Sequence, residues 1–350
     1  MNDKKAGIYS PISLEALKLI GQRPKKIPNL LMSYLVLARF AGQADVGGFG
    51  SNRVIGAGAQ KVSEVLGIQW KRARLLIEEL IQLDVISVAP TSLKVGKCPA
   101  RFVLAHEGKV EIPHALIDGL DKVPGIMRLL NQAHGQLLET IATAIMVLVH
   151  CYSRHNMEAW GGVDSEAIRH DWVMDEVVPS GHGFRVKARR GTSDSPSCSQ
   201  SFFTDVMASL GFEGPDFPAG NVAFRAALQF LEDSGLVYEA VTLVDRHDKP
   251  LYPVRINDAY AVRSSSEPSQ IESIPGAAYY TGAQHPTGAA EGVWFFFPVD
   301  PGKEGMTLVG VTRLRFRCAN SSTARGLIRD ADNIQALRVQ LIKADMIDDL

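Results

Sequence analysis

The chain has 350 residues, of which 46% are hydrophobic and 21% are charged, and its formal net charge is −1. This length and apolar content predict a folded protein of two or three domains rather than a disordered one. A net charge near zero excludes a strong overall attraction to nucleic acid or membrane, so any such affinity must come from local patches. The four cysteines lie far apart without a CxxC pair, which argues against zinc ribbons and disulfide frameworks and favours reduced thiols.

Neither the start of the chain nor its most apolar segment predicts export or membrane insertion. The first ten residues, MNDKKAGIYS, lack the apolar stretch of a secretory signal. The apolar run at 141–149 is shorter than the about 20 residues that a bilayer-spanning helix needs. The sequence therefore predicts a soluble, cytoplasmic protein with no membrane partner.

The first predicted elements lie beside a glycine-rich stretch. The apolar pattern predicts a helix at 28–40 and a short strand at 53–55. The stretch GGFGSNRVIGAG at 47–58 looks at first like a phosphate-binding loop, but it lacks the third glycine of a dinucleotide fingerprint and the Gly-Lys-Ser/Thr ending of a P-loop. We therefore expect a connecting loop here, and no nucleotide or other cofactor.

Two helices and a hairpin follow this loop. A short helix around 62–66 is interrupted by Gly67-Ile68, and a longer helix is expected at 69–83. Strands are expected at 85–88 and 101–104, joined by a turn-rich stretch. The longer helix has an apolar stripe and an outward polar face at helical spacing. The stripe comprises Ala73, Leu76, Ile77, Leu80 and Leu83, and the outward face comprises Lys71, Arg72, Arg74 and Glu78.

The same order recurs later in the chain. A long apolar helix is expected at 137–152, a short strand at 162–163 and a helix at 201–210. The segment NVAFRAALQFLEDSGLVYE then aligns without a gap to the first longer helix at an offset of 151 residues. A hairpin of strands at 239–244 and 251–256 follows. The alignment pairs Arg74 with Arg225, Ile77 with Leu228, Leu80 with Leu231, Val85 with Leu236 and Ile86 with Val237.

A weaker third occurrence closes the chain. Leu80-Ile81-x-x-Asp84-x-Ile86 reappears as Leu341-Ile342-x-x-Asp345-x-Ile347, after a strand-like segment at 307–318 and a helix start at Ser321-Ser322. The sequence stops where the hairpin that follows the two earlier occurrences would begin. Three alternatives therefore stay open: an incomplete third copy of the same unit, a partner-binding tail, and a copy that has been cut. The aromatic run at 294–297 indicates a buried strand.

Two polar stretches are expected to lie outside the helices and strands. RVKARRGTSDSPSCSQ at 185–200 is basic and then serine-rich, which indicates a mobile loop inside the second module. The stretch 262–292 is rich in turn residues and proline, which indicates an interdomain linker. The expected fold is mainly α with small β-hairpins, in the α+β class. The expected domains are an N-terminal arm (1–25), a first module (26–115), a connector (116–135), a second module (136–262), a linker (263–292) and a C-terminal module (293–350).

The order helix, short strand, helix, turn, helix and hairpin resembles the winged helix-turn-helix domain of DNA-binding proteins. The resemblance is architectural and covers roughly residues 26–262. It implies tandem winged helices, in which the second helix of the first helix-turn-helix enters the major groove and the wing contacts the DNA backbone or the minor groove. The DNA-binding residues that it implies in the first module are Gln69, Lys71, Arg72 and Arg74 on the helix, and Lys94 and Lys97 in the wing.

The second module has fewer cations at the matching positions. Val222 and Ala223 stand where the first module has Lys71 and Arg72, so that DNA contact and dimerisation are both open for it. A dense cationic run nearby is either a phosphate clamp or a solvated loop. The candidate DNA contacts are Asn221 and Arg225 on the helix, Arg246 and Lys249 in the wing, and Arg185, Lys187, Arg189 and Arg190 in the cationic run.

Residue types that carry catalysis or bind metals are scattered along the chain. The nine histidines lack the spacing of a ligand set, and no Gly-x-Ser-x-Gly nucleophile elbow is present in the sequence. The sequence therefore predicts a protein that is not an enzyme and holds no metal.

These features together predict sequence-specific binding of double-stranded DNA, as a homodimer on a repeated or palindromic site. Two winged helices in a chain of this length resemble the replication initiators of plasmids and phages, and a transcriptional regulator of the same build fits equally well. The alternative is a non-enzymatic interaction module, in which winged helices bind a protein partner. The C-terminal module is a further candidate for binding a protein.

Overall fold

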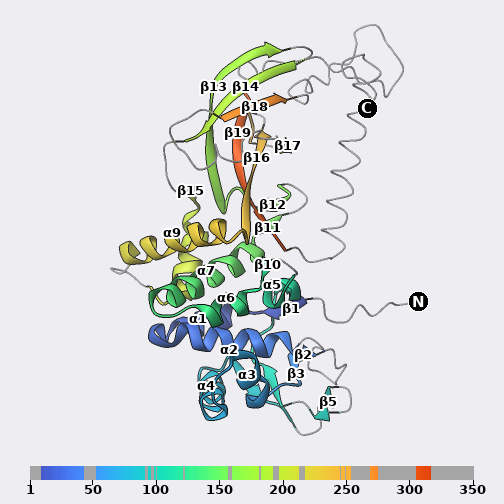
Figure 1. The fold of residues 1–350 in the computed structure, drawn as a ribbon, viewed down its shortest axis with the longest axis vertical. Coiled ribbons are helices and arrows are strands. Elements are labelled where there is room, and N and C mark those ends of the chain that lie inside the picture. Colours follow the sequence, from blue (N-terminus) through green and yellow to red (C-terminus); the bar gives the residue numbers. More distant parts are fainter. Residues whose placement is uncertain are drawn as a thin grey trace, which may run out of the picture. The chain divides into compact units, whose positions relative to one another are not determined.

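The computed structural model combines helices with antiparallel strand pairs and belongs to the α+β class, as the sequence predicts (Figure 1). The chain divides into two compact units. The structure describes residues 9–42, 53–90, 94–95, 98–99, 101–120, 123–156, 160–180, 183–191, 197–212, 217–244, 246–248, 250–253, 269–274 and 305–316.

The two units cut across the predicted modules. The first unit contains residues 1–155, 200–237 and 314–323, and the second contains residues 156–199, 238–313 and 324–350. The range 136–262, predicted as one module, is therefore shared between them. The reason is packing: the helices of this range lie against helices from the start of the chain, whereas its long strands pair with one another and with a strand at 307–314.

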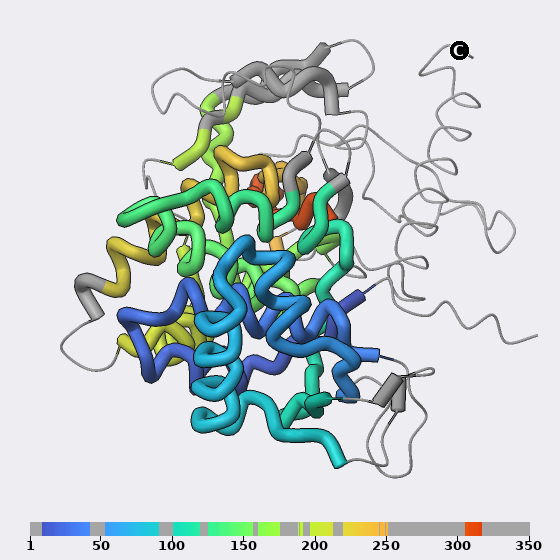
Figure 2. Tube along the Cα trace, turned by 60° about the horizontal axis from the view of Figure 1, so that its bottom comes forward, coloured from blue at the N-terminus to red at the C-terminus, as the bar shows by residue number. Residues whose placement is uncertain are grey.

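Nine α-helices and a 3-10 turn are described, and all of them belong to the first unit. The helix predicted at 28–40 is confirmed and lies almost wholly in the core, where other helices pack around it (Figure 2). The helices are α1 (Leu14–Gly21), η1 (Pro24–Lys26), α2 (Ile27–Arg39), α3 (Ala59–Leu66), α4 (Trp70–Gln82), α5 (His114–Asp118), α6 (Ile126–Gln132), α7 (Gln136–Ser153), α8 (Gln200–Ser209) and α9 (Phe217–Asp233).

The strands of the first unit form short antiparallel pairs. The four-stranded sheet has the order β2-β3-β7-β4, in which Val54 is opposite Val103 and Ser87 is opposite Val103 on the other side. The strands are β1 (Tyr9–Ile12), β2 (Ala41–Gly42), β3 (Val54–Ile55), β4 (Ile86–Val88), β5 (Lys94–Val95), β6 (Cys98–Pro99), β7 (Phe102–Leu104), β8 (Val110–Pro113), β9 (Gly119–Leu120) and β10 (Val123–Pro124). This agrees with the strands predicted at 53–55, 85–88 and 101–104.

A seven-stranded sheet, larger than the predicted small hairpins, organises the second unit. Its order is β17-β16-β19-β13-β14-β18, and β15 pairs with β13. The predicted hairpin of 239–244 and 251–256 is present as β16 and β17. The strands outside the first unit's sheets are β11 (His155–Asn156), β12 (Gly162–Val163), β13 (Ile168–Ser180), β14 (Gly183–Arg190), β15 (Ser197–Cys198), β16 (Val237–Val244), β17 (Pro250–Pro253), β18 (Ser269–Ile274) and β19 (Thr307–Leu314).

Two predictions about connecting segments are wrong. The stretch at 185–200 is not a mobile loop along its length, because 183–190 is strand β14, paired with β13 and β18. The segment at 263–292 is not a linker throughout, because Ser269–Ile274 is strand β18. In both cases the backbone N–H and C=O groups of a polar stretch form hydrogen bonds with a neighbouring strand. A strand paired in this way can carry charged side chains. The predictions for 294–297, for the helix start at 321–322 and for 341–347 lie outside the described residues.

The helix α7 is long and apolar. It has 18 residues and extends beyond the apolar run at 141–149, and by length and composition alone it could cross a bilayer. In the structure, the side chains from Ile141 to Cys151 are mostly buried, and α7 packs against α2, α8 and α9. Burial within the first unit is sufficient to account for its apolar composition.

The two predicted helix-turn-helix segments, α3–α4 and α8–α9, share their local geometry. The turns after α3 and α8 have left-handed glycines, with φ of 63° at Gly67 and 76° at Gly211. Both longer helices also end with the same backbone hydrogen bond, donated by the residue that follows a left-handed residue. Val85 N donates to Leu80 O over 2.9 Å, and Leu236 N donates to Leu231 O over 3.0 Å. The aligned buried pairs are Ala73 and Phe224, Leu76 and Ala227, Ile77 and Leu228, and Leu80 and Leu231.

Candidate nucleic-acid interface

One face of α4 is fixed in the core and the other faces solvent. Ala73, Leu76, Ile77 and Leu80 are buried, and the helix packs on α2 and α3 (Figure 2). The spacing of these residues leaves a continuous outward face on the opposite side. The predicted stripe is therefore confirmed, and the outward residues of α4 are held in a defined direction by the buried ones.

Three cations on α4 are exposed at the N-terminal half of the helix. Arg72 Nη2 donates to Asn29 Oδ1 over 3.2 Å, and Arg74 Nε is 2.7 Å from Glu78 Oε1. Lys71 has no hydrogen-bond or ion-pair partner in the part of the chain that the structure describes. The first turn contains no acidic residue, and the N-cap Gln69 makes no side-chain capping bond. The partial positive charge of the helix start therefore adds to that of the side chains.

Two further cations lie beside α4, and the sequence prediction missed them. Lys26 Nζ is 2.9 Å from Glu79 Oε2, and Arg23 Nε is 3.7 Å from Glu79 Oε1. The run RPKK in the sequence signalled these charges, but only the fold places them alongside α4. Lys25, which lies between them in the sequence, instead lines a groove with residues of α7 and α9. We call the five residues Arg23, Lys26, Lys71, Arg72 and Arg74 the α4 basic surface.

Two large apolar side chains on α4 are also exposed. Trp70 is 50% exposed and Leu75 is 64% exposed. The guanidinium of Arg74 lies 5.9 Å from the centre of the Trp70 ring, which is within the range of a cation–π contact. The sequence prediction treated neither residue as functional, because it assigned roles on α4 only to polar and charged side chains.

The predicted wing tip of the first module, between β4 and β7, is described only in its backbone, at 94–95 and 98–99. Lys94 lies on β5, where it is opposite Pro99 on β6, and nothing is described of its side chain. Lys97 lies outside the described residues. Arg53, which precedes β3, is not available to a ligand, because its guanidinium donates to the carbonyl oxygens of Leu104 and Ala105.

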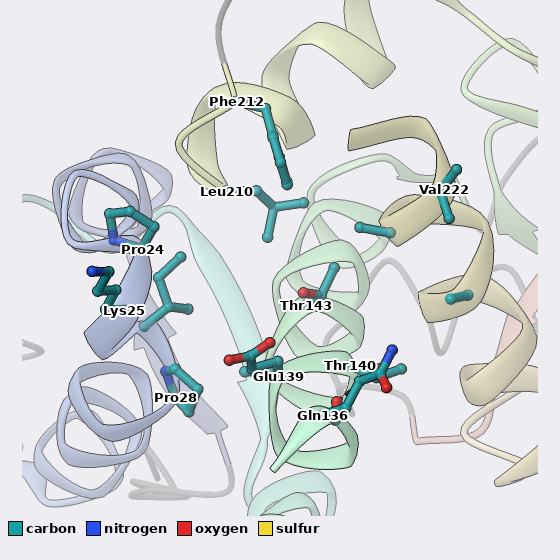
Figure 3. Close-up of a pocket in the computed structure, with 14 residues that line it drawn as sticks. Pro24, Lys25, Pro28, Gln136, Glu139, Thr140, Thr143, Leu210, Phe212 and Val222 are labelled. Carbon is teal, nitrogen blue, oxygen red and sulfur yellow. Dashed lines mark hydrogen bonds between the residues drawn. The ribbon is translucent and has the colours of Figure 1, made fainter. Parts of the chain in front are cut away.

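The helix α9 presents a less charged surface than α4. Arg225 Nε donates to Asn221 Oδ1 over 3.2 Å, so these two predicted contacts pair with each other on the helix surface. Val222 is 70% exposed and lies at the edge of a groove of about 480 Å³. Figure 3 shows this groove, with Leu210 and Phe212 after α8, Thr143 and Glu139 on α7, and Lys25 and Pro28 on the side of α2.

The remaining predicted contacts belong to the second unit. Arg185, Lys187 and Arg189 are part of strand β14, so they do not form the expected loop. Arg190 contacts His170 and lies 3.5 Å from the buried carboxylate of Glu239, which also accepts a 2.7 Å bond from the Trp172 indole. Arg246 is exposed, and its Nε donates to His247 Nε2 over 3.2 Å, whereas Lys249 lies outside the described residues.

Two histidines are buried and held neutral. Burial is the main cause that lowers the pKa of His150 to about 4, and its Nε2 lies 2.9 Å from Ser209 Oγ. Burial and then the charge of Arg190 lower the pKa of His170 to about 3. Each is enclosed within its own unit, at 2% and 3% exposure, so neither meets a substrate from solvent.

The described residues contain no group of three His, Cys, Asp or Glu side chains arranged to hold a metal ion. Cys151 and Cys198 are not joined in a disulfide, and burial raises the pKa of Cys198 to about 12. No family model, curated protein or solved structure matches this chain. The α4 basic surface is therefore the best-supported site, on its geometry and charge.

Proposed function

We propose that the protein binds double-stranded DNA in the cytoplasm through the α4 basic surface. The observation that carries this proposal is the exposure of Lys71, Arg72 and Arg74 at the start of a helix whose opposite face is buried. Lysine and arginine at the N-terminal half of a helix suit phosphates and base edges in the major groove. The backbone N–H groups at the helix start favour the same negatively charged ligand.

The order of the elements around α4 supports a winged-helix interpretation of the first module. The helix α2 is followed by β3, α3 and α4, and then by β4 and β7, with β7 hydrogen-bonded between β3 and β4. In winged helix-turn-helix domains this framework presents the second helix of the motif to the groove. We propose this fold for the first module and a related, divergent one for α7, α8 and α9.

The ion pairs within the surface do not oppose DNA binding. The pairs of Glu79 with Lys26 and of Glu78 with Arg74 join exposed cations to carboxylates, and such pairs contribute little to stability, about 0–1 kcal/mol each. A phosphate can therefore compete for either cation at small cost. Each phosphate that the protein neutralises releases counterions, which makes the affinity depend on salt.

The proposal is tested by measuring affinity for a random-sequence duplex over a range of salt concentrations. Replacing Lys71, Arg72 and Arg74 together by Ala removes charge without lowering helix propensity. We expect weaker binding and a slope of log affinity against log salt that is shallower by up to about 3, since each phosphate contact contributes about 0.9. A matched control replaces Lys109, Arg128 and Arg154, three exposed cations of the same unit, and should change the slope little.

Two outcomes would contradict the proposal. One is an absence of binding at low salt, and the other is an equal loss of slope in the control variant. If binding is confirmed, the selected sites distinguish the two roles: direct repeats beside an AT-rich segment favour a replication initiator, and an inverted repeat at a promoter favours a transcriptional regulator. Two-fold related half-sites would also support the expected homodimer.

A second candidate function is the binding of a protein, and the groove beside α9 favours it. Val222, Ala223 and Ala226 of α9 line the groove together with Pro24 and Phe212 (Figure 3). Grooves with apolar side chains on one wall commonly accept an amphipathic helix of a protein partner. This function on its own predicts no salt-dependent affinity for DNA, so the same titration separates the two.

A further inference from the structure

Leu75 is an apolar residue in the middle of a charged, solvent-facing surface. Its side chain is 64% exposed on α4, whereas the residue aligned with it on α9 is Ala226. It lies one helical turn after Lys71 and directly after Arg74, so that the three share the outward face. A single exposed leucine is ordinary, but this one lies within the surface that we propose for DNA.

The position of Leu75 on the helix suits contact with base edges. It is the sixth residue of α4, which begins at Trp70, and it projects away from the buried stripe of Ala73, Leu76 and Ile77. If Lys71 and Arg74 engage phosphates or guanine on either side, the Leu75 side chain faces the floor of the groove. An aliphatic side chain there cannot donate or accept a hydrogen bond, and it selects for an apolar group on the base.

We infer that Leu75 contacts the 5-methyl group of thymine in the major groove, and that it contributes specificity for thymine at one position of the DNA site. This inference rests on the proposed function. Among the four bases, thymine alone presents a methyl group in the major groove. Three cations and two carboxylates lie within one turn of Leu75, and the carboxylates of Glu78 and Glu79 are paired with Arg74 and Lys26. The net charge around Leu75 is therefore positive, which favours a polyanionic partner over an apolar protein surface.

Trp70 acts with Leu75 as a positioning residue, because it holds the side chain of Arg74 in place. Its ring lies against the guanidinium of Arg74, and Arg74 is in turn bonded to Glu78. These two contacts hold the arginine along the helix surface beside Leu75. The charge of Glu78, which lies on the same face, is thereby offset by Arg74.

The experiment uses duplexes selected from a random-sequence library by the full-length protein at low salt. Each thymine of the selected site is then replaced in turn by deoxyuridine, which removes only the methyl group. We expect one replacement to weaken binding about fourfold, the factor that corresponds to burial of one methyl group. The same replacement should have no effect on the Leu75→Ala variant, which binds the original site about as weakly as the natural protein binds the uracil site.

The control variant is Leu137→Ala, which removes a leucine of similar exposure, 51%, from α7 in the same unit. This variant should bind the thymine duplex more tightly than the uracil duplex by the same factor as the natural protein does. The inference is overturned if no replacement weakens binding, or if Leu75→Ala retains the sensitivity to uracil. Strong, salt-dependent binding without a methyl effect would leave the proposed function intact, whereas the recovery of no duplex would overturn both.

Discussion

The two predicted helix-turn-helix segments of the first unit have the same framework and different surfaces. In α3–α4 and α8–α9, the aligned residues that face the core are buried, and the turns and helix ends share the same hydrogen bonds. At the exposed positions, Lys71 and Arg72 correspond to Val222 and Ala223, and Leu75 corresponds to Ala226. The core and the backbone turns therefore constrain the fold, while the exposed positions are free to take on different functions.

The surroundings of the two segments differ as well. The outward face of α4 is bordered by Arg23 and Lys26, whereas Val222, Ala223 and Ala226 of α9 border a groove with α7 and the end of α8. One segment presents cations suited to a polyanion, and the other presents small apolar side chains at the edge of a groove. This difference is the basis of the proposal that α4 binds DNA and that α9 binds a protein partner.

The largest difference expected between the two segments concerns the glycine of each turn. A Cβ atom at Gly67 would meet nothing within 4 Å, whereas a Cβ atom at Gly211 would lie 2.3 Å from the carbonyl oxygen of Gly21. Gly67→Ala should destabilise the protein by about 1 kcal/mol, the cost of a left-handed alanine. Gly211→Ala should destabilise it by about 3–4 kcal/mol, because the backbone of α1 must also move. Urea unfolding measures both free energies.

The control for this comparison is Gly235→Ala in the second segment. Gly235 is also left-handed, with φ of 68°, and a Cβ atom there would meet nothing within 4 Å. Its cost should equal that of Gly67→Ala. Equal losses for Gly67 and Gly211 would show that the close approach of α1 to α8 is not a constraint on the second segment.

The helices could be predicted from the sequence because their evidence is local. The apolar stripe of α4 and the Leu66-Gly67-Ile68 helix end lie within a few residues of one another, and so does the aligned stripe of α9. The structure confirms these helices to within a few residues, except that α9 begins earlier, at Phe217. The prediction of small hairpins underestimated the size of the sheet in the second unit, because strands distant in the chain pair there into one sheet.

The missed features depend on contacts between distant residues. Strand β14 was predicted as a loop because its cations dominated the pattern, although Phe184, Val186 and Ala188 alternate with them at the period of a strand. The cations of η1 join the α4 surface only because Lys26 reaches Glu79, which is 53 residues away. Sequence spacing alone therefore identified Lys71, Arg72 and Arg74 as candidates, but could not identify their neighbours.

The second segment should also be the more sensitive to acid, because a histidine is buried behind it. His150 of α7 bonds to Ser209, which occupies the position of Val65 in the first segment. Burial lowers the pKa of His150 in the folded protein to about 4, below its ordinary value of 6.5. Between pH 6.5 and about pH 4 the unfolded chain binds a proton that the folded protein does not. The free energy of unfolding is therefore highest above pH 6.5 and decreases as the pH falls.

The expected loss is about 2.5 kcal/mol between about pH 7.5 and about pH 4.5. His150→Gln keeps a hydrogen-bonding side chain beside Ser209 and cannot titrate, so this part of the pH dependence should vanish in urea unfolding. His170→Gln is the comparison variant, because His170 is buried in the other unit with a pKa lowered to about 3. This variant should keep the part of the pH dependence that His150 contributes. An unchanged pH dependence in His150→Gln would mean that this histidine is not held neutral by the fold.

The smallest expected effect is at the ends of α4 and α9, where the two segments use different residues for the same backbone conformation. Asp84 has φ of 55° and Gly235 has φ of 68°, and each precedes the residue that donates back to the helix. Because a residue with a side chain is strained there, Gly235→Asp should destabilise the protein by about 1 kcal/mol, and Asp84→Gly should stabilise it by up to about 0.5 kcal/mol. Urea unfolding of the two single variants and of the double variant tests this. If the sites are independent, the double variant should show the sum of the two changes. A stabilising Gly235→Asp would contradict the equivalence of the two helix ends.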